Sequence, residues 1–152
     1  MILRQGKLGD IGEIVELFES SIRQICAKDY STDQIEAWVT KQANSDRWTD
    51  LMKDQYVVIA EEKSIAGFGS LKEDHYIDML YVHPDFQNQG VASKICDKLL
   101  ESRSNKTKAL KTDASEPARP FFERKGFVVE TKNVFNLNGV EIHNYRMTKT
   151  NA

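Results

Sequence analysis

Residues 87–92, Gln-Asn-Gln-Gly-Val-Ala, have the types and spacing of a loop that binds phosphate groups. They follow a strand-like run, 76–82, and lead into a segment whose apolar residues repeat at helical spacing. The first N–H groups of a helix lack partners within the helix, and the helix dipole adds partial positive charge there. Gly90 would let a ligand approach the backbone, and Ala92 is small. The pattern predicts an anion cradle suited to a diphosphate; the alternative is an ordinary turn that starts a helix.

Other sites have less support in the sequence. There is no Gly-x-x-x-x-Gly-Lys-Ser/Thr loop and no Gly-x-Gly-x-x-Gly after the first strand. The two cysteines, Cys26 and Cys96, each fall on the apolar stripe of an expected helix, so we expect buried, reduced thiols. The three histidines show no spacing that would activate a cysteine, and neither Cys-x-x-Cys nor His-x-x-x-His occurs. We therefore expect no metal site.

Composition narrows the class of protein further. The 152 residues fit one domain, 1–152, and 40% hydrophobic with 29% charged residues is typical of a soluble globular protein. A net charge of −2 and a pI near 5.9 argue against a nucleic-acid-binding surface. No apolar run approaches the ~18 residues that a membrane span needs, and residues 1–5 resemble a first strand rather than a signal peptide. We expect a cytoplasmic protein.

Apolar periodicity predicts the elements that must position the loop. Strands are expected at 1–5, 56–60, 65–71, 76–82, 109–112, 127–134 and 142–147. Helices are expected at 11–26, 33–39, 91–100 and 116–125. Asp10 would cap the first helix, Thr32 or Asp33 the second, and Gly126 would end the last. A polar loop around Trp48 is expected before the second strand.

Asn138 and Gly139 lie between the last two strands and are a strong hairpin signal. The order is then β-α-α-β-β-β-α-β-α-β-β. This alternation predicts an α/β fold in one domain, with a mixed sheet and helices on its faces.

Two motifs in this order resemble the GNAT superfamily of acyl-CoA-dependent N-acetyltransferases. Residues 80–92, Leu-Tyr-Val-His-Pro-Asp-Phe-Gln-Asn-Gln-Gly-Val-Ala, are similar to its strand, short turn and Gln/Arg-x-x-Gly-x-Gly/Ala loop. Residues 118–127, Ala-Arg-Pro-Phe-Phe-Glu-Arg-Lys-Gly-Phe, are similar to its second signature, which ends in Gly-Phe. The element order extends the resemblance to essentially the whole chain.

The resemblance implies that acetyl-CoA is the co-substrate. Its pantetheine arm would lie in a V-shaped opening between the strand that ends at Val82 and the strand near 109–112, and would pair with the backbone of Leu80 and Val82 like an extra strand. Backbone amides of 87–92 would hold the pyrophosphate. The residues expected at the cofactor are Leu80, Tyr81, Val82, Gln87, Asn88, Gln89, Gly90, Val91, Ala92, Ser115 and Phe122.

The implied reaction is direct attack of an amine on the acetyl thioester in a ternary complex, which needs a base. Asp78 is the first candidate. Residue alternation places Asp78 on the strand face of Tyr76, Leu80 and Val82. A carboxylate among apolar neighbours tends to a raised pKa, which suits a base. The alternative is a structural carboxylate paired with a basic side chain. His75 and Glu73 are weaker candidates because both fall in an expected turn. A backbone N–H near Leu80 would polarise the thioester carbonyl.

The chain departs from the family where a proton donor is usual. A Tyr commonly stands four residues before the Gly of the second signature, and this chain has Phe122 there; an Asn common three residues before the Ala is Ser115. Either another phenol, Tyr145 or Tyr81, protonates the sulfur, or no acid is needed. We favour the second explanation because a thiol with a pKa of roughly 8.5 leaves readily as thiolate. The Ser115 hydroxyl or a helix N-terminus would stabilise that thiolate.

The acceptor would lie against the connection between the first two helices. Asp29-Tyr30-Ser31, followed by Gln34 and Trp38, resembles a bacterial subgroup of the superfamily. Tyr30 and Trp38, with Trp48, would form an aromatic wall for a cationic amine; the alternative is that they pack in the core. The expected partner is a primary amine of a small molecule or peptide, and the protein would be a monomer or homodimer.

Two other functions are compatible with the sequence. The Phe at position 122 motivates a non-catalytic acyl-CoA sensor or regulatory protein on the same fold. The third possibility is an α/β domain whose glycine loop binds nothing.

Overall fold

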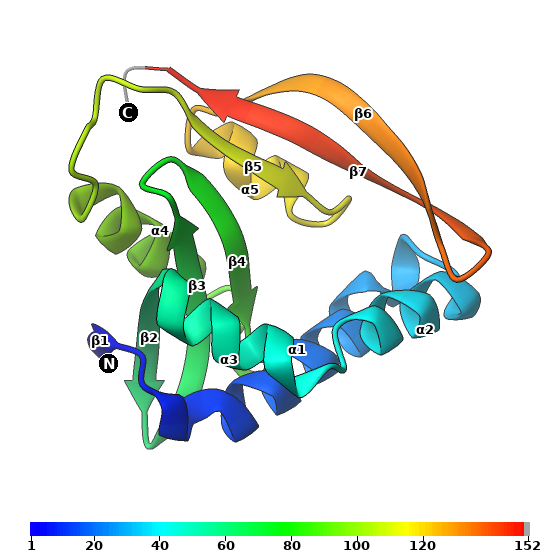
Figure 1. Cartoon of the computed structure of the whole chain (residues 1–152), viewed down its shortest axis with the longest axis horizontal. Helices are drawn as coiled ribbons and strands as arrows, with labels where there is room; N and C mark the ends of the chain where they lie inside the picture. The colour runs from blue at the N-terminus through cyan, green and yellow to red at the C-terminus, as the bar shows by residue number, and fades with distance from the viewer. Residues whose placement is uncertain (151–152) are drawn as a thin grey trace.

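The apolar runs of the sequence form one seven-stranded sheet in the order β1-β2-β3-β4-β5-β7-β6 (Figure 1). The structure is a computed structural model that describes residues 1–150. Its strands are β1 (Ile2–Gln5), β2 (Tyr56–Glu62), β3 (Ser64–Lys72), β4 (Tyr76–Val82), β5 (Leu110–Ala114), β6 (Val128–Leu137) and β7 (Val140–Lys149). Its longer helices are α1 (Ile11–Ile25), α2 (Thr32–Lys41), α3 (Ser45–Asp54), α4 (Val91–Glu101) and α5 (Arg119–Arg124). The predicted mixed α/β sheet is confirmed.

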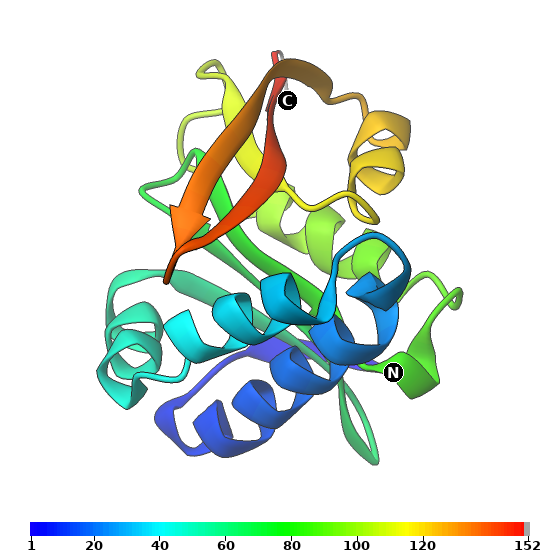
Figure 2. The same cartoon turned by 90° about the vertical axis from the view of Figure 1, so that its right-hand side faces the viewer.

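Two buried clusters lie on opposite faces of the sheet. On one face α1, α2 and α3 pack against the side chains of Phe68 and Met79. On the other face α4 and α5 pack against Ile77 and Val82. The close approach of α4 requires Gly69 in β3, because a Cβ there would lie 2.7 Å from a methyl of Ile95. Figure 2 shows α1 and α2 crossing in front of the sheet.

The sheet splits between its two central strands. β4 and β5 are parallel, and they pair only through Tyr76 with Lys111 and Ile77 with Thr112. The Thr112 hydroxyl donates a buried hydrogen bond of 2.9 Å to the Ile77 carbonyl at the point where pairing stops. Beyond it the two strands diverge (Figure 1). This geometry confirms the predicted V-shaped opening.

A β-bulge in β4 lies directly beside this opening. Ser70 of β3 pairs with Met79, and the next residue, Leu71, pairs with Ile77. Asp78 is therefore an extra residue that has no partner in the ladder with β3.

The bulge changes which side chains share a face of β4. Met79 and Tyr81 pack in the cluster of α1, α2 and α3, whereas Leu80 and Val82 pack in the cluster of α4. Asp78 lines a cavity together with Met79 and Tyr81. The prediction that Asp78 shares a face with Leu80 and Val82 is wrong, because simple alternation does not hold across a bulge.

A helix, α3, forms where a polar loop was predicted. The side chain of Asn44 accepts a hydrogen bond of 2.9 Å from the N–H of Asp46 and so caps the helix. Trp48 and Leu51, one turn apart, are both buried. The Trp48 indole N–H donates to the Gln42 carbonyl at 2.7 Å, which satisfies its one polar group.

The cap of α2 lies one residue earlier than predicted. Ser31, rather than Thr32 or Asp33, accepts from the N–H of Gln34, and the Gln34 side chain accepts from the N–H of Ser31. The two residues form a reciprocal capping box.

Two further helix starts differ from prediction. Asp10 stands before α1, but its carboxylate accepts from the Arg4 guanidinium and the Lys7 N–H instead of capping α1. Helix α5 begins at Arg119 rather than at 116–117. Every helix within residues 1–150 is too short or too polar to cross a bilayer.

The predicted glycine and hairpin signals are confirmed. Gly126 follows α5 with a φ of +95°, a conformation that favours glycine. Asn138 and Gly139, with φ values of +50° and +82°, form the two-residue turn between β6 and β7.

Candidate active site

Two cavities lie at the opening of the sheet. The first, here the loop cavity, has a volume of about 530 Å³ and is lined by residues of β4, α4 and α5 that include Val82, Gly90 and Phe122. The second, the helix cavity, has a volume of about 250 Å³ and lies beside α2 and α3. Tyr81 and Ser115 line both cavities, and the place of these two shared residues is here called the junction.

The loop cavity contains every residue expected at the cofactor except Gln89. Gln89 is exposed, and its amide donates to the Asp85 carbonyl at 3.4 Å instead. The loop is tied to the sheet because the Gln87 amide donates to the Val82 carbonyl at 2.9 Å. The cavity thus gathers the loop and the divergent end of β4.

Gly90 supplies the backbone conformation at the start of α4. Its φ is +77°, in the left-handed region, and a Cβ built on it would meet no atom within 4 Å. Glycine is therefore required for its dihedral angles, while the space above it is open to a ligand. Val91, Ala92 and Ser93, whose N–H groups begin the helix, all line the loop cavity. This is the geometry of an anion site.

Sequence reasoning missed two basic side chains of the loop cavity. Arg124 and Lys125 line it from the end of α5. Lys125 pairs with Asp97 at 2.8 Å. Arg124 is exposed and has no carboxylate within ion-pair distance among residues 1–150. Their position just before Gly126, inside the second signature, was the signal available in the sequence.

Phe122 is an apolar wall of the loop cavity. Only 4% of it is exposed, and its ring packs edge-on against Phe121 and Phe127 at centroid distances of 5.2 and 5.1 Å. The position where the resemblance implies a phenol therefore holds a packed side chain with no proton to donate.

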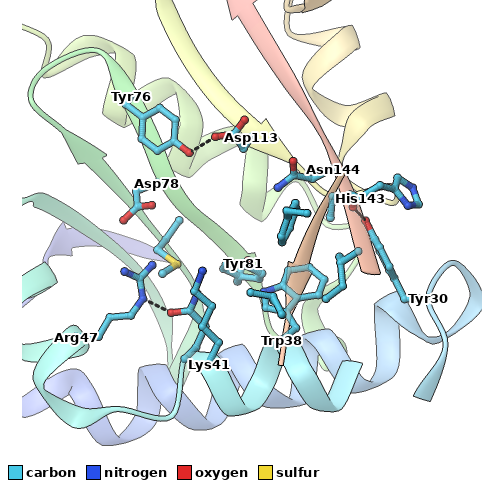
Figure 3. Close-up of a pocket in the computed structure, with 16 residues that line it drawn as sticks. Tyr30, Trp38, Lys41, Arg47, Tyr76, Asp78, Tyr81, Asp113, His143 and Asn144 are labelled. Atoms are coloured by element: carbon cyan, nitrogen blue, oxygen red, sulfur yellow. Dashed lines mark hydrogen bonds between the residues drawn. The ribbon is translucent and has the colours of Figure 1, made fainter. Parts of the chain in front are cut away.

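Asp78 lines the helix cavity with an uncompensated carboxylate. Its Oδ2 accepts from the Gln55 amide at 2.8 Å, and no cation within residues 1–150 lies in ion-pair distance of it. Figure 3 shows the carboxylate facing the cavity. The structure therefore does not bear out the alternative of a carboxylate paired with a basic side chain.

Asp113, a second carboxylate of the helix cavity, is fully engaged. It accepts two hydrogen bonds from Arg146, at 2.7 and 2.8 Å, and one each from Tyr76 and Asn133. Burial alone would raise the pKa of Asp113, but the bonds from Arg146 and Tyr76 lower it. Burial and the neighbouring Asp113 raise the pKa of Tyr76. Asp113 is therefore a structural anion, and Asp78 is the carboxylate of the helix cavity that is available to accept a proton.

Tyr30 and Trp38 line the helix cavity and also pack closely. The Tyr30 hydroxyl donates to the His143 carbonyl at 3.0 Å and accepts from the Glu116 N–H at 2.8 Å. It joins the start of α2 to β7 and to the turn after β5. Burial raises its pKa to about 12. Trp48 does not line this cavity; it is 1% exposed and packs in the core, so its predicted place in an aromatic wall is wrong.

The two phenols considered as proton donors occupy different places. Tyr145 lines neither cavity; it lies under the Arg119 guanidinium, 5.0 Å from its ring centroid, and a hydrogen bond to Glu116 raises its pKa. Tyr81 stands at the junction, packed between Phe18 and Phe68, and burial raises its pKa strongly.

Both cysteines are buried and unpaired, as predicted. Burial raises the pKa of Cys26 to about 12 and that of Cys96 to about 11. Cys26 lines the loop cavity, but a thiol with so high a pKa is a poor nucleophile at neutral pH.

Comparison with known sequences identifies the family. The sequence model of the Acetyltransferase (GNAT) domain matches residues 26–149. The chain belongs to the GNAT acetyltransferase family. The sequence is also 34% identical over 146 residues to the uncharacterized N-acetyltransferase YafP of Escherichia coli, covering 95% of this chain and 93% of that one. The protein is thus an acetyl-CoA-dependent N-acetyltransferase.

Solved acetyltransferase structures have the same fold. A GCN5-related N-acetyltransferase from Rhodopseudomonas palustris superposes with a TM-score of 0.90 at 35% identity, covering 98% of this chain and 94% of that one. PaiA N-acetyltransferase from Thermoplasma acidophilum, solved in complex with coenzyme A, has a TM-score of 0.79 at 17% identity, covering 99% of each chain. YncA of Salmonella typhimurium, solved with acetyl-CoA, has a TM-score of 0.67 at 17% identity, covering 100% of this chain and 94% of that one.

Proposed function

We propose that this GNAT protein transfers the acetyl group of acetyl-CoA to the primary amine of a small molecule by direct attack in a ternary complex. One observation carries the proposal: the loop cavity and the helix cavity share Tyr81 and Ser115 as lining residues. A thioester that entered from the loop cavity would end where an amine in the helix cavity could reach it.

The loop cavity suits acetyl-CoA. The pyrophosphate binds the N–H groups at the start of α4, next to Gly90, and Arg124 offers a further cation for a phosphate. The pantetheine arm pairs with the backbone of Leu80 and Val82, where β4 has no partner in β5. Two fold neighbours solved with coenzyme A or acetyl-CoA support this assignment.

Asp78 is the proposed base on the acceptor side. It takes the proton of the attacking ammonium directly or through one water, and Gln55 orients it. A backbone N–H near Leu80 or Tyr81 polarises the thioester carbonyl as the tetrahedral intermediate forms. Because the Cys26 thiol keeps its proton, an acyl-enzyme on that residue is disfavoured and direct attack is favoured.

The thiolate leaves without a dedicated acid. Phe122 has no proton to donate, Tyr145 lines neither cavity, and the raised pKa of Tyr81 makes it a weak donor. Ser115 at the junction donates a hydrogen bond to the departing sulfur. Because a thiol has a pKa of roughly 8.5, one such hydrogen bond is enough for the thiolate to leave near neutral pH.

The proposal is tested by incubating the protein with acetyl-CoA and a panel of amines while free thiol is measured. Thiol release that depends on an added amine, with intersecting initial-rate patterns, is the expected result. Tight coenzyme A binding without release on any amine would instead indicate a sensor. Parallel initial-rate patterns would contradict direct attack.

A further inference from the structure

The helix cavity carries two basic side chains opposite Asp78. Lys41, at the end of α2, and Arg47, in the first turn of α3, both line it. Figure 3 shows both reaching into the cavity from the helical side. Among residues 1–150 neither lies within 4.0 Å of a carboxylate oxygen. Two cations without partners on the wall of a cavity are free to bind an anion.

Arg47 is held in position for this role. It is half-buried, and its Nε donates to the side-chain oxygen of Gln42, which leaves the two terminal nitrogens for a ligand. The backbone carbonyl of Gln42 accepts a hydrogen bond from the indole N–H of the buried Trp48, which holds Gln42 in place. Asp46 and Asp50 border the neighbouring surface cleft together with Arg47, but neither forms an ion pair with it. The guanidinium is thus fixed by an amide rather than neutralised by an acid.

The charges of the helix cavity do not balance without a ligand. Asp113 is matched by Arg146, so Lys41 and Arg47 stand against the single carboxylate of Asp78. A purely cationic amine would meet two like charges in this cavity. A molecule that carries both an amine and a carboxylate would place its carboxylate against Lys41 and Arg47 and its amine against Asp78.

The size of the cavity limits the acceptor. Its volume of about 250 Å³ lies just below the ~300–1,000 Å³ range that is typical of small-molecule pockets. A small amino acid fits this space, and a peptide chain would have to extend out of it. Trp38 and Tyr30 then contact the aliphatic part of the ligand.

We propose that the acceptor is a free amino acid whose carboxylate binds Arg47 and Lys41 and whose amine faces Asp78 at the junction of the cavities. This inference rests on the proposed acetyl transfer. It differs from the cationic amine predicted from the aromatic residues alone, because α3 and its arginine were not foreseen.

Turnover provides the first test. Thiol release is measured with common amino acids, each beside its carboxamide, its decarboxylated amine and a dipeptide that begins with it. We expect kcat/KM for one amino acid to exceed that for its carboxamide and amine at least tenfold. Arg47→Gln and Lys41→Gln should each lower that value roughly 10- to 100-fold, through KM, and leave the carboxamide unchanged.

Matched variants separate charge from folding. Lys53→Gln removes an exposed α3 cation that lines neither cavity and should change nothing. Arg47→Lys keeps the charge and should retain part of the preference. An amine or carboxamide used as well as the amino acid would overturn the inference while acetyl transfer stands. Preference for the dipeptide would overturn the free amino acid as the acceptor.

Binding provides a test that does not require turnover. The coenzyme A-bound protein is titrated calorimetrically with the same compounds. Saturable binding of an amino acid that Arg47→Gln abolishes would support the carboxylate site, even if the absence of thiol release refuted acetyl transfer. Failure of every amino acid to bind and to react would overturn the inference.

Discussion

Asp78 reaches the helix cavity because β4 contains one residue more than its pairing with β3 uses. If it is the base, Asp78→Asn keeps the shape and the Gln55 contact but cannot take up a proton. We expect kcat to fall by roughly 10²–10⁴-fold, with unchanged coenzyme A affinity by calorimetry. Tyr145→Phe, which alters a residue outside both cavities, is the control and should keep full activity. Full activity of Asp78→Asn would exclude it as the base.

Substitution of Tyr81, the phenol at the junction, tests whether the departing sulfur of coenzyme A needs a proton donor. Burial raises the pKa of Tyr81, so its hydroxyl stays protonated at neutral pH and donates weakly. We expect Tyr81→Phe to lower kcat by far less than the 10²–10⁴-fold typical of a lost acid. Phe122→Tyr should leave kcat unchanged or slightly raised. A severe loss of kcat in folded Tyr81→Phe would show that this phenol is the donor.

At the scale of elements, the turn into α4 combines a left-handed backbone conformation at Gly90 with the proposed anion site. Gly90→Asn and Gly90→Asp introduce side chains of equal size that tolerate a positive φ, and they differ only in charge. We expect Asn to weaken coenzyme A binding slightly and Asp to weaken it at least about tenfold further, because its carboxylate repels the pyrophosphate. Calorimetry at two salt concentrations measures this, and the difference should shrink at high salt. Equal affinities for the two variants would contradict a phosphate site at this turn.

How far the sequence predicted the site depends on how local each determinant is. The Gly90 loop was predictable because its φ requirement and its place before a helix are properties of a few adjacent residues. The position of Asp78 was not, since the bulge is a property of the pairing of β4 with β3. Helix α3 was missed because only Trp48 and Leu51 are buried on an otherwise polar segment, and Arg47 was missed with it.

At the scale of the molecule, buried acids with raised pKa values set a limit to alkaline stability. Burial raises the pKa of the Cys96 thiol from 9.0 to about 11. It raises the pKa of the Cys26 thiol from 9.0, and that of the Tyr30 phenol from 10.0, to about 12. The folded state therefore holds more protons than the unfolded state between these values, so stability is complete below pH ~9 and falls as pH rises through ~11–12. Urea unfolding across this range should show the decline, with a shallower slope for Cys96→Ala. Constant stability up to pH ~12 would contradict it.

The short pairing of β4 with β5 has a consequence for cooperativity. The ladder that joins the β1–β4 part of the sheet to β5–β7 has two register pairs. The Tyr30 side chain adds hydrogen bonds to the His143 carbonyl and the Glu116 N–H. Native-state hydrogen exchange should therefore find two units, with β6 and β7 opening at a lower free energy than β2 and β3. A donor bound in the loop cavity contacts both sides, from Val82 to Phe122. Its binding should merge the two units into one, so that the free enzyme unfolds in parts and the loaded enzyme unfolds as a whole.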